Sequence, residues 1–289
     1  MNGDDPDLIP AGALRGVTVG LSVSDSADLS RLGLDEQHIN LAVGEITRAI
    51  LIAGGTIAYG GWLRPSGFTH QLMDEVRRFG VTRHSLTLYV ALPEHRELGR
   101  EELDYVDRQL GTWGTLITLD IDGNPIDWRA LPQSDGPLAD DDRVAAYSGL
   151  RRHMAGCIDG RILVGGKLRG YLGAIPGVIE EALLAMERSQ PIYLAGGFGG
   201  AAAAVARRLH PGDLAWLPPG LPDGEDEPGA QEALRRLDSL VVESGWKVSN
   251  DGLTPERRAQ LSASHRPGEV ASLCVVGLAM KFSRQEGQG

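Results

Sequence analysis

Residues 17–26, with the sequence VTVGLSVSDS, indicate the fold class. The first seven are mostly apolar and rich in β-branched residues, and a Ser/Asp cluster follows them, as expected for a buried parallel strand. Residues 36–53 then carry apolar side chains at helical spacing and stop at a glycine pair. Two more strands are predicted at 56–59 and 85–91, with a helix between Gly67 and Gly80. This βαβαβ pattern is typical of a Rossmann-like α/β fold, a parallel sheet with helices on both faces.

After residue 91 the alternation continues, and the chain then changes character. We predict helices at 101–110, 140–158, 178–188 and ending at Leu209, strands at 116–120, 162–164 and 191–195, and an exposed loop at 122–142. Residues 216–230 are rich in Pro, Gly and acidic residues and indicate a linker. Helical patterns return at 231–243, 255–263 and 267–281. We therefore expect an α/β domain over 1–215 and a C-terminal helical extension over 231–289 that covers the sheet edge or joins two protomers.

Composition limits the class of partner. The chain has 289 residues, of which 42% are hydrophobic and 23% charged, as in ordinary globular proteins. Its net charge of −11 argues against a nucleic-acid partner or an anionic membrane, because both require a basic face. No stretch approaches the roughly 20 apolar residues of a membrane span, and Met1 to Arg15 lacks the apolar core of a signal peptide. A small phosphorylated ligand needs only a local arginine cluster and stays compatible with this charge.

The cysteines and histidines predict a cytoplasmic protein without a metal site. Cys157 and Cys274 lie far apart, outside any metal-binding spacing, and we expect both to be buried thiols in a reducing compartment. The seven histidines form no HxxxH or HExxH pair, so no zinc is expected. The glycine loops do not form a GxGxxG fingerprint in the right position or a P-loop, and no cofactor is expected.

Residues 151–181, RRHMAGCIDGRILVGGKLRGYLGAIPGVIEE, predict an anion site. An arginine-rich helix precedes a short strand, and a glycine-rich loop then leads into a helix with two carboxylates in its first turn. Unpaired N–H groups and the helix dipole attract anions there, the arginines suggest a phosphorylated ligand, and the carboxylates suggest a ribose. The alternative is that the glycine loop is only a turn and that the charged side chains only face solvent, in which case the stretch has a structural role. The candidate residues are Arg151, Arg152, Gly165, Gly166, Gly173, Pro176, Gly177, Glu180 and Glu181.

Three other strand ends contribute candidates. Ser22, Ser24 and Asp25 follow the first strand and either hold phosphate or ribose or cap the next segment. The second strand end offers close backbone approach, a phosphate-pairing arginine and a helix start, through Gly60, Gly61, Arg64, Gly67 and Thr69. Gly197, in the GGFGG run at 196–200, either contacts the ligand or allows close helix–strand packing.

Four elements in series resemble the SLOG superfamily, which includes DprA, the LOG-type nucleotide phosphoribohydrolases and the N-terminal domains of TRPM channels. They are VTVGLSVSDS, IAYGGWLRPSGFT, the RRHM helix with its glycine pair and PGVIEE, and PIYLAGGFGG. The resemblance covers about residues 15–210. It implies a Rossmann-like domain whose pocket, at the carboxyl edge of the sheet, binds nucleotide-derived ligands.

The resemblance also implies roles for particular residues. In the hydrolytic members, a PGG-x-GT-x-x-E motif carries a Glu that assists cleavage of the ribose–base bond, and a preceding helix supplies an Arg. Glu181 matches that Glu, with Glu180 beside it, and Arg151 or Arg152 matches the Arg. This sequence departs from the motif by Val178 in place of Thr and by a long insert that carries Lys167 and Arg169. The two extra cations suit a ligand with more phosphate, such as ADP-ribose or a cyclic relative.

Three hypotheses follow. The first is a sensor that binds ADP-ribose or a cyclic ADP-ribose-like signal without processing it, as sensor-type members of the superfamily do. The second is a nucleotide N-glycosidase, a phosphoribohydrolase in which Glu181 assists release of the base. The third is a structural assembly module whose glycine loops are only turns. The resemblance further implies a homo-oligomer.

Overall fold

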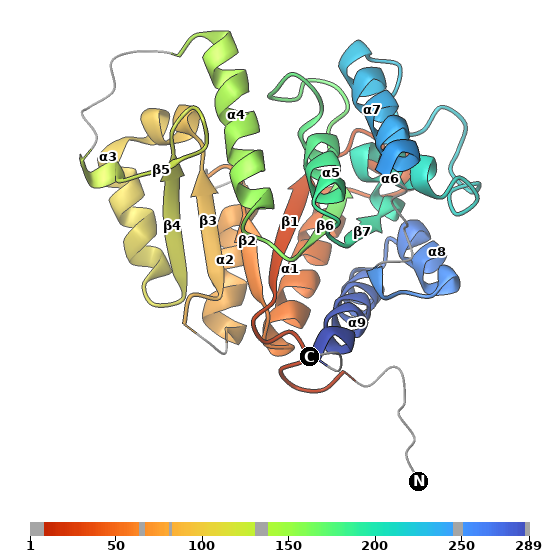
Figure 1. Ribbon diagram of the computed structural model, residues 1–289, viewed down its shortest axis with the longest axis horizontal. Coiled ribbons are helices and arrows are strands. Elements are labelled where there is room, and N and C mark those ends of the chain that lie inside the picture. The colour runs from red at the N-terminus through yellow and green to blue at the C-terminus, as the bar shows by residue number, and fades with distance from the viewer. Residues whose placement is uncertain (1–8, 64–66, 81–82, 131–137, 245–250, 287–289) are drawn as a thin grey trace.

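The protein, described here by a computed structural model over residues 9–63, 67–80, 83–130, 138–244 and 251–286, contains one seven-stranded sheet (Figure 1). The strand order is β5-β4-β3-β2-β1-β6-β7, and every neighbouring pair is parallel except β4 and β5. The strands are β1 (Thr18–Ser24), β2 (Thr56–Tyr59), β3 (Leu86–Val90), β4 (Gly114–Leu119), β5 (Pro125–Ile126), β6 (Gly160–Gly165) and β7 (Ile192–Ala195).

Helices cover both faces of this sheet, as the sequence predicts. The helices are α1 (Glu36–Ile52), α2 (Phe68–Phe79), α3 (Leu92–Leu110), α4 (Asp140–Ala155), α5 (Gly177–Glu187), α6 (Gly200–Leu209), α7 (Pro228–Ser244), α8 (Pro255–Ala263) and α9 (Pro267–Glu286). Apolar residues of α1, α2, α3 and α9 share one core with the sheet. A second core joins β6 and β7 to α5, α6 and α7, and a third joins α4 to β2, β3 and β4. The Rossmann-like α/β prediction is thereby confirmed.

Alternation along β6 illustrates how one strand serves two cores. Successive side chains of a strand point to opposite faces. Ile162 and Val164 accordingly join the core of α1 and α9, whereas Leu163 joins the core of α5 and α6. All three side chains are fully buried. The continuous apolar run is therefore the signature of a central parallel strand.

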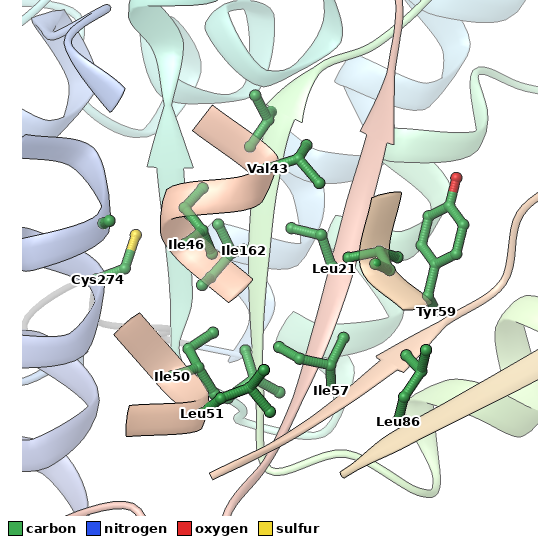
Figure 2. Close-up of a cluster of buried hydrophobic side chains, with 14 of the residues drawn as sticks. Leu21, Val43, Ile46, Ile50, Leu51, Ile57, Tyr59, Leu86, Ile162 and Cys274 are labelled. Carbon is green, nitrogen blue, oxygen red and sulfur yellow. The ribbon is translucent and has the colours of Figure 1, made fainter. Parts of the chain in front are cut away.

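The C-terminal helices pack on the sheet core. Figure 2 shows Cys274 of α9 facing α1, where Ile46 lies between α9 and the strands. Helices were predicted at 231–243, 255–263 and 267–281, and α7, α8 and α9 confirm all three. No helix within the described ranges is long and apolar enough to cross a membrane.

Three expectations need correction. The region predicted as an exposed loop at 122–142 contains β5 and a short 3-10 helix, Trp128–Ala130, in which Trp128 is buried against the sheet core. An unpredicted helical segment precedes the predicted helix at 101–110: α3 begins at Leu92, with Pro93 in its first turn, and a kink at Gly99 separates the two parts. Cys157 is exposed, since it lies beyond the end of α4 in the turn before β6, whereas Cys274 is buried as expected.

The topology places a crevice beside β1. From β1 the chain passes to α1 on one face, whereas from β6 it passes to α5 on the other, although the two strands are neighbours. The loops after such strands diverge, and ligands of open α/β sheets bind at this switch point. The carboxyl ends of the parallel strands lie along the upper edge of the sheet in Figure 1.

Candidate functional site

A cavity of about 380 Å³ opens at this switch point. Its volume lies in the range of about 300–1,000 Å³ that is usual for small-molecule sites. Seven parts of the chain converge on it: the ends of β1 and β2, the starts of α2 and α3, the middle of α4, the loop after β6 and the start of α5. The lining residues are Leu21, Ser22, Val23, Ser24, Asp25, Tyr59, Gly60, Gly61, Trp62, Gly67, Phe68, Glu94, Tyr147, Leu150, Arg151, Lys167, Gly170, Tyr171, Leu172, Gly177, Val178 and Glu181.

Two of these helices present uncapped N-termini to the cavity. Helix α2 starts after Gly67 and helix α5 after Pro176, and neither of these preceding residues makes a side-chain capping bond. The first N–H groups of a helix have no partner within the helix, and the dipole adds positive potential. Gly67 and Gly177 both line the cavity, so the two starts face one space. The arrangement favours anionic groups inside it.

Arg151 lies directly against the start of α5. A Cβ atom at Gly177 would come within 2.5 Å of Arg151 Nη2, so glycine admits the guanidinium to this position. Arg151 Nη1 pairs with Glu180 at 2.6 Å, and Nη2 donates to the carbonyl of Leu172 at 3.2 Å. A cation beside a helix N-terminus opposes the dipole. An anion bound here would interact favourably with both.

Glu181 forms an ion pair with Arg161, whose side chain has no solvent exposure. Arg161 Nη1 donates to Ser22 Oγ at 2.8 Å and lies 3.2 Å from Glu181 Oε2. Burial lowers the pKa of Arg161, and the charge of Glu181 opposes that shift. The Nε and Nη2 atoms of Arg161 have no hydrogen-bond partner within the described ranges. Glu180 and Glu181 thus have different partners, and Glu181 is the one that lines the cavity.

Tyr59 stands at the end of β2 and contributes its hydroxyl to the cavity. Only 5% of the residue is exposed, and Figure 2 shows the hydroxyl directed away from Ile57 and Leu86. Burial raises the pKa of Tyr59 well above its usual value, and the negative charges of Glu94, Glu181 and Asp25 raise it further. The phenol therefore stays protonated and available as a donor.

The loop after β6 is fixed to β1 through backbone contacts. Gly166 N–H donates to the carbonyl of Ser24 at 2.9 Å, and Lys167 N–H donates to Ser24 Oγ at 3.2 Å. Gly166 has φ = +105°, and a Cβ atom there would lie 2.8 Å from that of Ala201. Glycine is therefore required where the loop passes α6. These bonds place the exposed Lys167 at the rim of the cavity.

The structure brings together ten of the candidate residues at this cavity. They are Ser22, Ser24, Asp25, Gly60, Gly61, Gly67, Arg151, Lys167, Gly177 and Glu181. Five others support its walls without lining it, namely Gly165, Gly166, Gly173, Pro176 and Glu180. Arg64 lies outside the described residues.

Four candidates point elsewhere. Arg152 is exposed on α4, and Thr69 is buried with its hydroxyl donating to the carbonyl of Trp62 at 2.7 Å. Arg169 is held by three carboxylates, Asp223 at 3.0 Å, Asp226 at 2.9 Å and Glu227 at 2.8 Å. Gly197 packs against the backbone of Ser264 before α9.

Sequence reasoning missed five residues at or beneath the cavity: Tyr59, Trp62, Glu94, Tyr147 and Arg161. Two of these residues could have been identified from the sequence. Tyr147 stands one helical turn before Arg151 on the same face of α4, and Glu94 follows Pro93 in the first turn of α3. Arg161 could not, because a charged residue at a strand start ordinarily indicates solvent.

A second cavity, of about 570 Å³, adjoins the first through Trp62 and Glu94. Its lining includes Glu97, Glu102 and Tyr105 and, within the described ranges, no lysine or arginine. It offers carboxylates and aromatic rings, and the starts of α2 and α3 contribute His70 and Glu94 to its lining. In the part of the chain that the structure describes, no three His, Cys, Asp or Glu side chains are arranged to hold a metal ion.

Comparison with known proteins places the chain among Rossmann-like nucleotide-associated domains. No curated protein matches it significantly. The model of a protein family described as SLOG cluster2 matches residues 13–226, which include the whole sheet and every residue that lines the 380 Å³ cavity. The chain therefore belongs to the SLOG cluster2 family, within the SLOG superfamily.

Proposed function

We propose that the protein binds a nucleotide-derived ligand, such as ADP-ribose or a cyclic ADP-ribose-like signal, in the cavity at the switch point. One observation carries this proposal: uncapped N-termini of α2 and α5 face the same cavity, with Arg151 and Lys167 beside them. Backbone N–H groups, a guanidinium and an ammonium are the groups that bind phosphates in proteins.

The phosphate end of the ligand would lie at the start of α5. Arg151 is already packed against Gly177 there, and Lys167 stands at the rim. A second phosphate would reach the start of α2 at Gly67. Arg169 would have to leave its three carboxylates before its guanidinium could contact a phosphate.

The ribose and base would occupy the side of the cavity near β1 and β2. Ser24 and Asp25 offer hydroxyl and carboxylate oxygens to ribose hydroxyls. Tyr59, Trp62 and Tyr147 offer aromatic surface to a base. Trp62 also hydrogen-bonds to Tyr147, which steadies the two rings against each other.

A nucleotide N-glycosidase is the second candidate, and the Arg161–Glu181 pair favours it. Cleavage of a ribose–base bond builds positive charge on the sugar, and a fixed carboxylate stabilises that charge. Glu181 lines the cavity and is held at 3.2 Å by a fully buried guanidinium. Such a carboxylate needs no reorganisation when the charge develops.

Ultrafiltration followed by mass spectrometry separates the candidates. The protein is incubated with AMP, ADP-ribose, NAD and cyclic ADP-ribose isomers, and both retained and released compounds are identified. A nucleotide retained intact supports the sensor, whereas free base that accumulates with turnover supports the glycosidase. In the latter case Glu181→Gln should abolish base release while Arg152→Gln, on the exposed face of α4, leaves it unchanged. A protein that neither retains nor cleaves any of them leaves the assembly module as the explanation.

A further inference from the structure

Tyr59 has a hydroxyl at the cavity of about 380 Å³ for which the described part of the chain supplies no hydrogen-bond partner. The residue is 5% exposed and lines the 380 Å³ cavity, yet none of the described residues forms a hydrogen bond with the hydroxyl. A phenol that opens on a cavity and has no partner among these residues is available to bind a ligand there. Its position is also maintained by Gly61, where any Cβ atom would collide with the Tyr59 hydroxyl.

Tyr193 provides the contrast within the same sheet. It is also a buried tyrosine on a parallel strand, β7, and its hydroxyl donates to the carbonyl of Asp251 at 2.7 Å. That bond ties β7 to the segment before α8. The sheet thus contains one tyrosine whose hydroxyl has a structural partner and another whose hydroxyl reaches an open cavity.

The groups around Tyr59 define what its partner must offer. The phenol stays protonated and so donates one hydrogen bond, and the carboxylates of Asp25 and Glu181 line the same cavity and accept. A ligand group placed among them must both accept and donate. A phosphate accepts only, and it would also meet negative charge at this end. The hydroxyls of a ribose do both.

We propose that Tyr59 is a ligand-binding residue that donates its hydrogen bond to a ribose hydroxyl of the bound nucleotide. This inference rests on the proposed function and adds an orientation to it. The ribose lies toward Tyr59 and Asp25, and the phosphate lies toward Arg151 at the start of α5.

A pair of matched variants tests the inference. Tyr59→Phe removes a hydroxyl that makes no hydrogen bond to the residues the structure describes, so the melting temperature should stay at the wild-type value. Tyr193→Phe removes a bonded hydroxyl and should lower it by about 2–4 °C. Isothermal titration with AMP should then give an affinity about threefold to tenfold weaker for Tyr59→Phe and unchanged for Tyr193→Phe.

Deoxy analogues identify the ligand atom. AMP, 2′-deoxy-AMP and 3′-deoxy-AMP are titrated against wild type and Tyr59→Phe. We expect one analogue to bind both proteins equally, because the contact is already missing. Equal AMP affinity for both proteins, or equal losses for AMP and both analogues, overturns the inference and leaves the proposed function intact. A wild-type protein that binds neither AMP nor ADP-ribose overturns both.

Discussion

Glu181 faces the cavity with its carboxylate 3.2 Å from Arg161, and no part of that arginine is exposed to solvent. A buried cation of this kind is tolerated only when an opposite charge and hydrogen bonds compensate it. Ser22 and Glu181 both contact the same guanidinium nitrogen. The pair therefore fixes where the Glu181 carboxylate lies, whether that carboxylate contacts a bound ribose or a reacting one.

Replacing Arg161 alone should lower the free energy of unfolding much more than replacing Arg161 and Glu181 together. Arg161→Met leaves the Glu181 carboxylate beside the core without its partner, and we expect the free energy of unfolding to fall by about 3–5 kcal/mol. The double variant Arg161→Met/Glu181→Gln removes both charges and should recover part of that loss. Urea denaturation measures all three proteins. A double variant no more stable than Arg161→Met would show that the two side chains do not act as a pair.

Arg151 and Arg152 are adjacent in sequence but should differ sharply in ligand binding. Arg151 lies against the start of α5, so Arg151→Gln removes a charged hydrogen-bond donor from the phosphate end. We expect the affinity for ADP-ribose to fall about tenfold to a hundredfold. Arg152→Gln changes the net charge equally on an exposed position and should leave the affinity unchanged. Equal losses for both variants would mean that only overall charge matters.

Two glycines of the loop after β6 offer a test of how closely it is packed. Gly166 and Gly170 both have positive φ, at +105° and +62°, but a Cβ atom at Gly166 would crowd Ala201 and Val178, whereas one at Gly170 meets nothing within 4 Å. Gly170→Ala should cost about 1–2 kcal/mol from backbone strain alone. Gly166→Ala adds the collision and should cost about 2–5 kcal/mol. Denaturation midpoints of the two variants give the loss of stability in each, and equal losses would contradict the packing argument.

Local pattern was sufficient for most of the fold. Short apolar runs bounded by glycine or polar residues became β1, β2, β3, β6 and β7, since buried parallel strands have this composition. The strand β5 was not predicted because two residues carry no periodicity, and their structure comes from pairing with β4. Cys157 was misjudged for a related reason, since burial depends on how the end of α4 meets the sheet.

The site was only partly predictable. That the loops after β1, β2 and β6 meet follows from parallel strands sharing a carboxyl edge, and the cavity there includes residues from all three. Which side chains pair depends on the tertiary structure and not on the local sequence. Nothing near Arg169 in sequence predicts its carboxylates at 223, 226 and 227, and nothing near Arg161 predicts Glu181. The boundary of the C-terminal extension stays a prediction, as does the homo-oligomer.

Acidification should destabilise the protein in part through His95. This side chain is buried in the first turn of α3, and its Nε2 lies 3.1 Å from the carbonyl of Leu119. Burial lowers the pKa of His95 below its usual value of 6.5. Above that value the imidazole is neutral in both states, and its contribution to stability is fully present. As the pH falls through about 6.5, the unfolded chain binds the proton first, so folding becomes less favourable.

The measurement is the melting temperature of wild type and His95→Gln between pH 7.5 and 5. Glutamine keeps a donor for the Leu119 carbonyl but does not titrate, so the variant should lose less stability on acidification than wild type. His265→Gln makes the same change at an exposed position and controls for residue type. His153 and His210 also have pKa values lowered by burial, so the melting temperature of His95→Gln should still fall somewhat as the pH is lowered. Identical slopes for wild type and His95→Gln would show that His95 binds its proton equally in the folded and unfolded states.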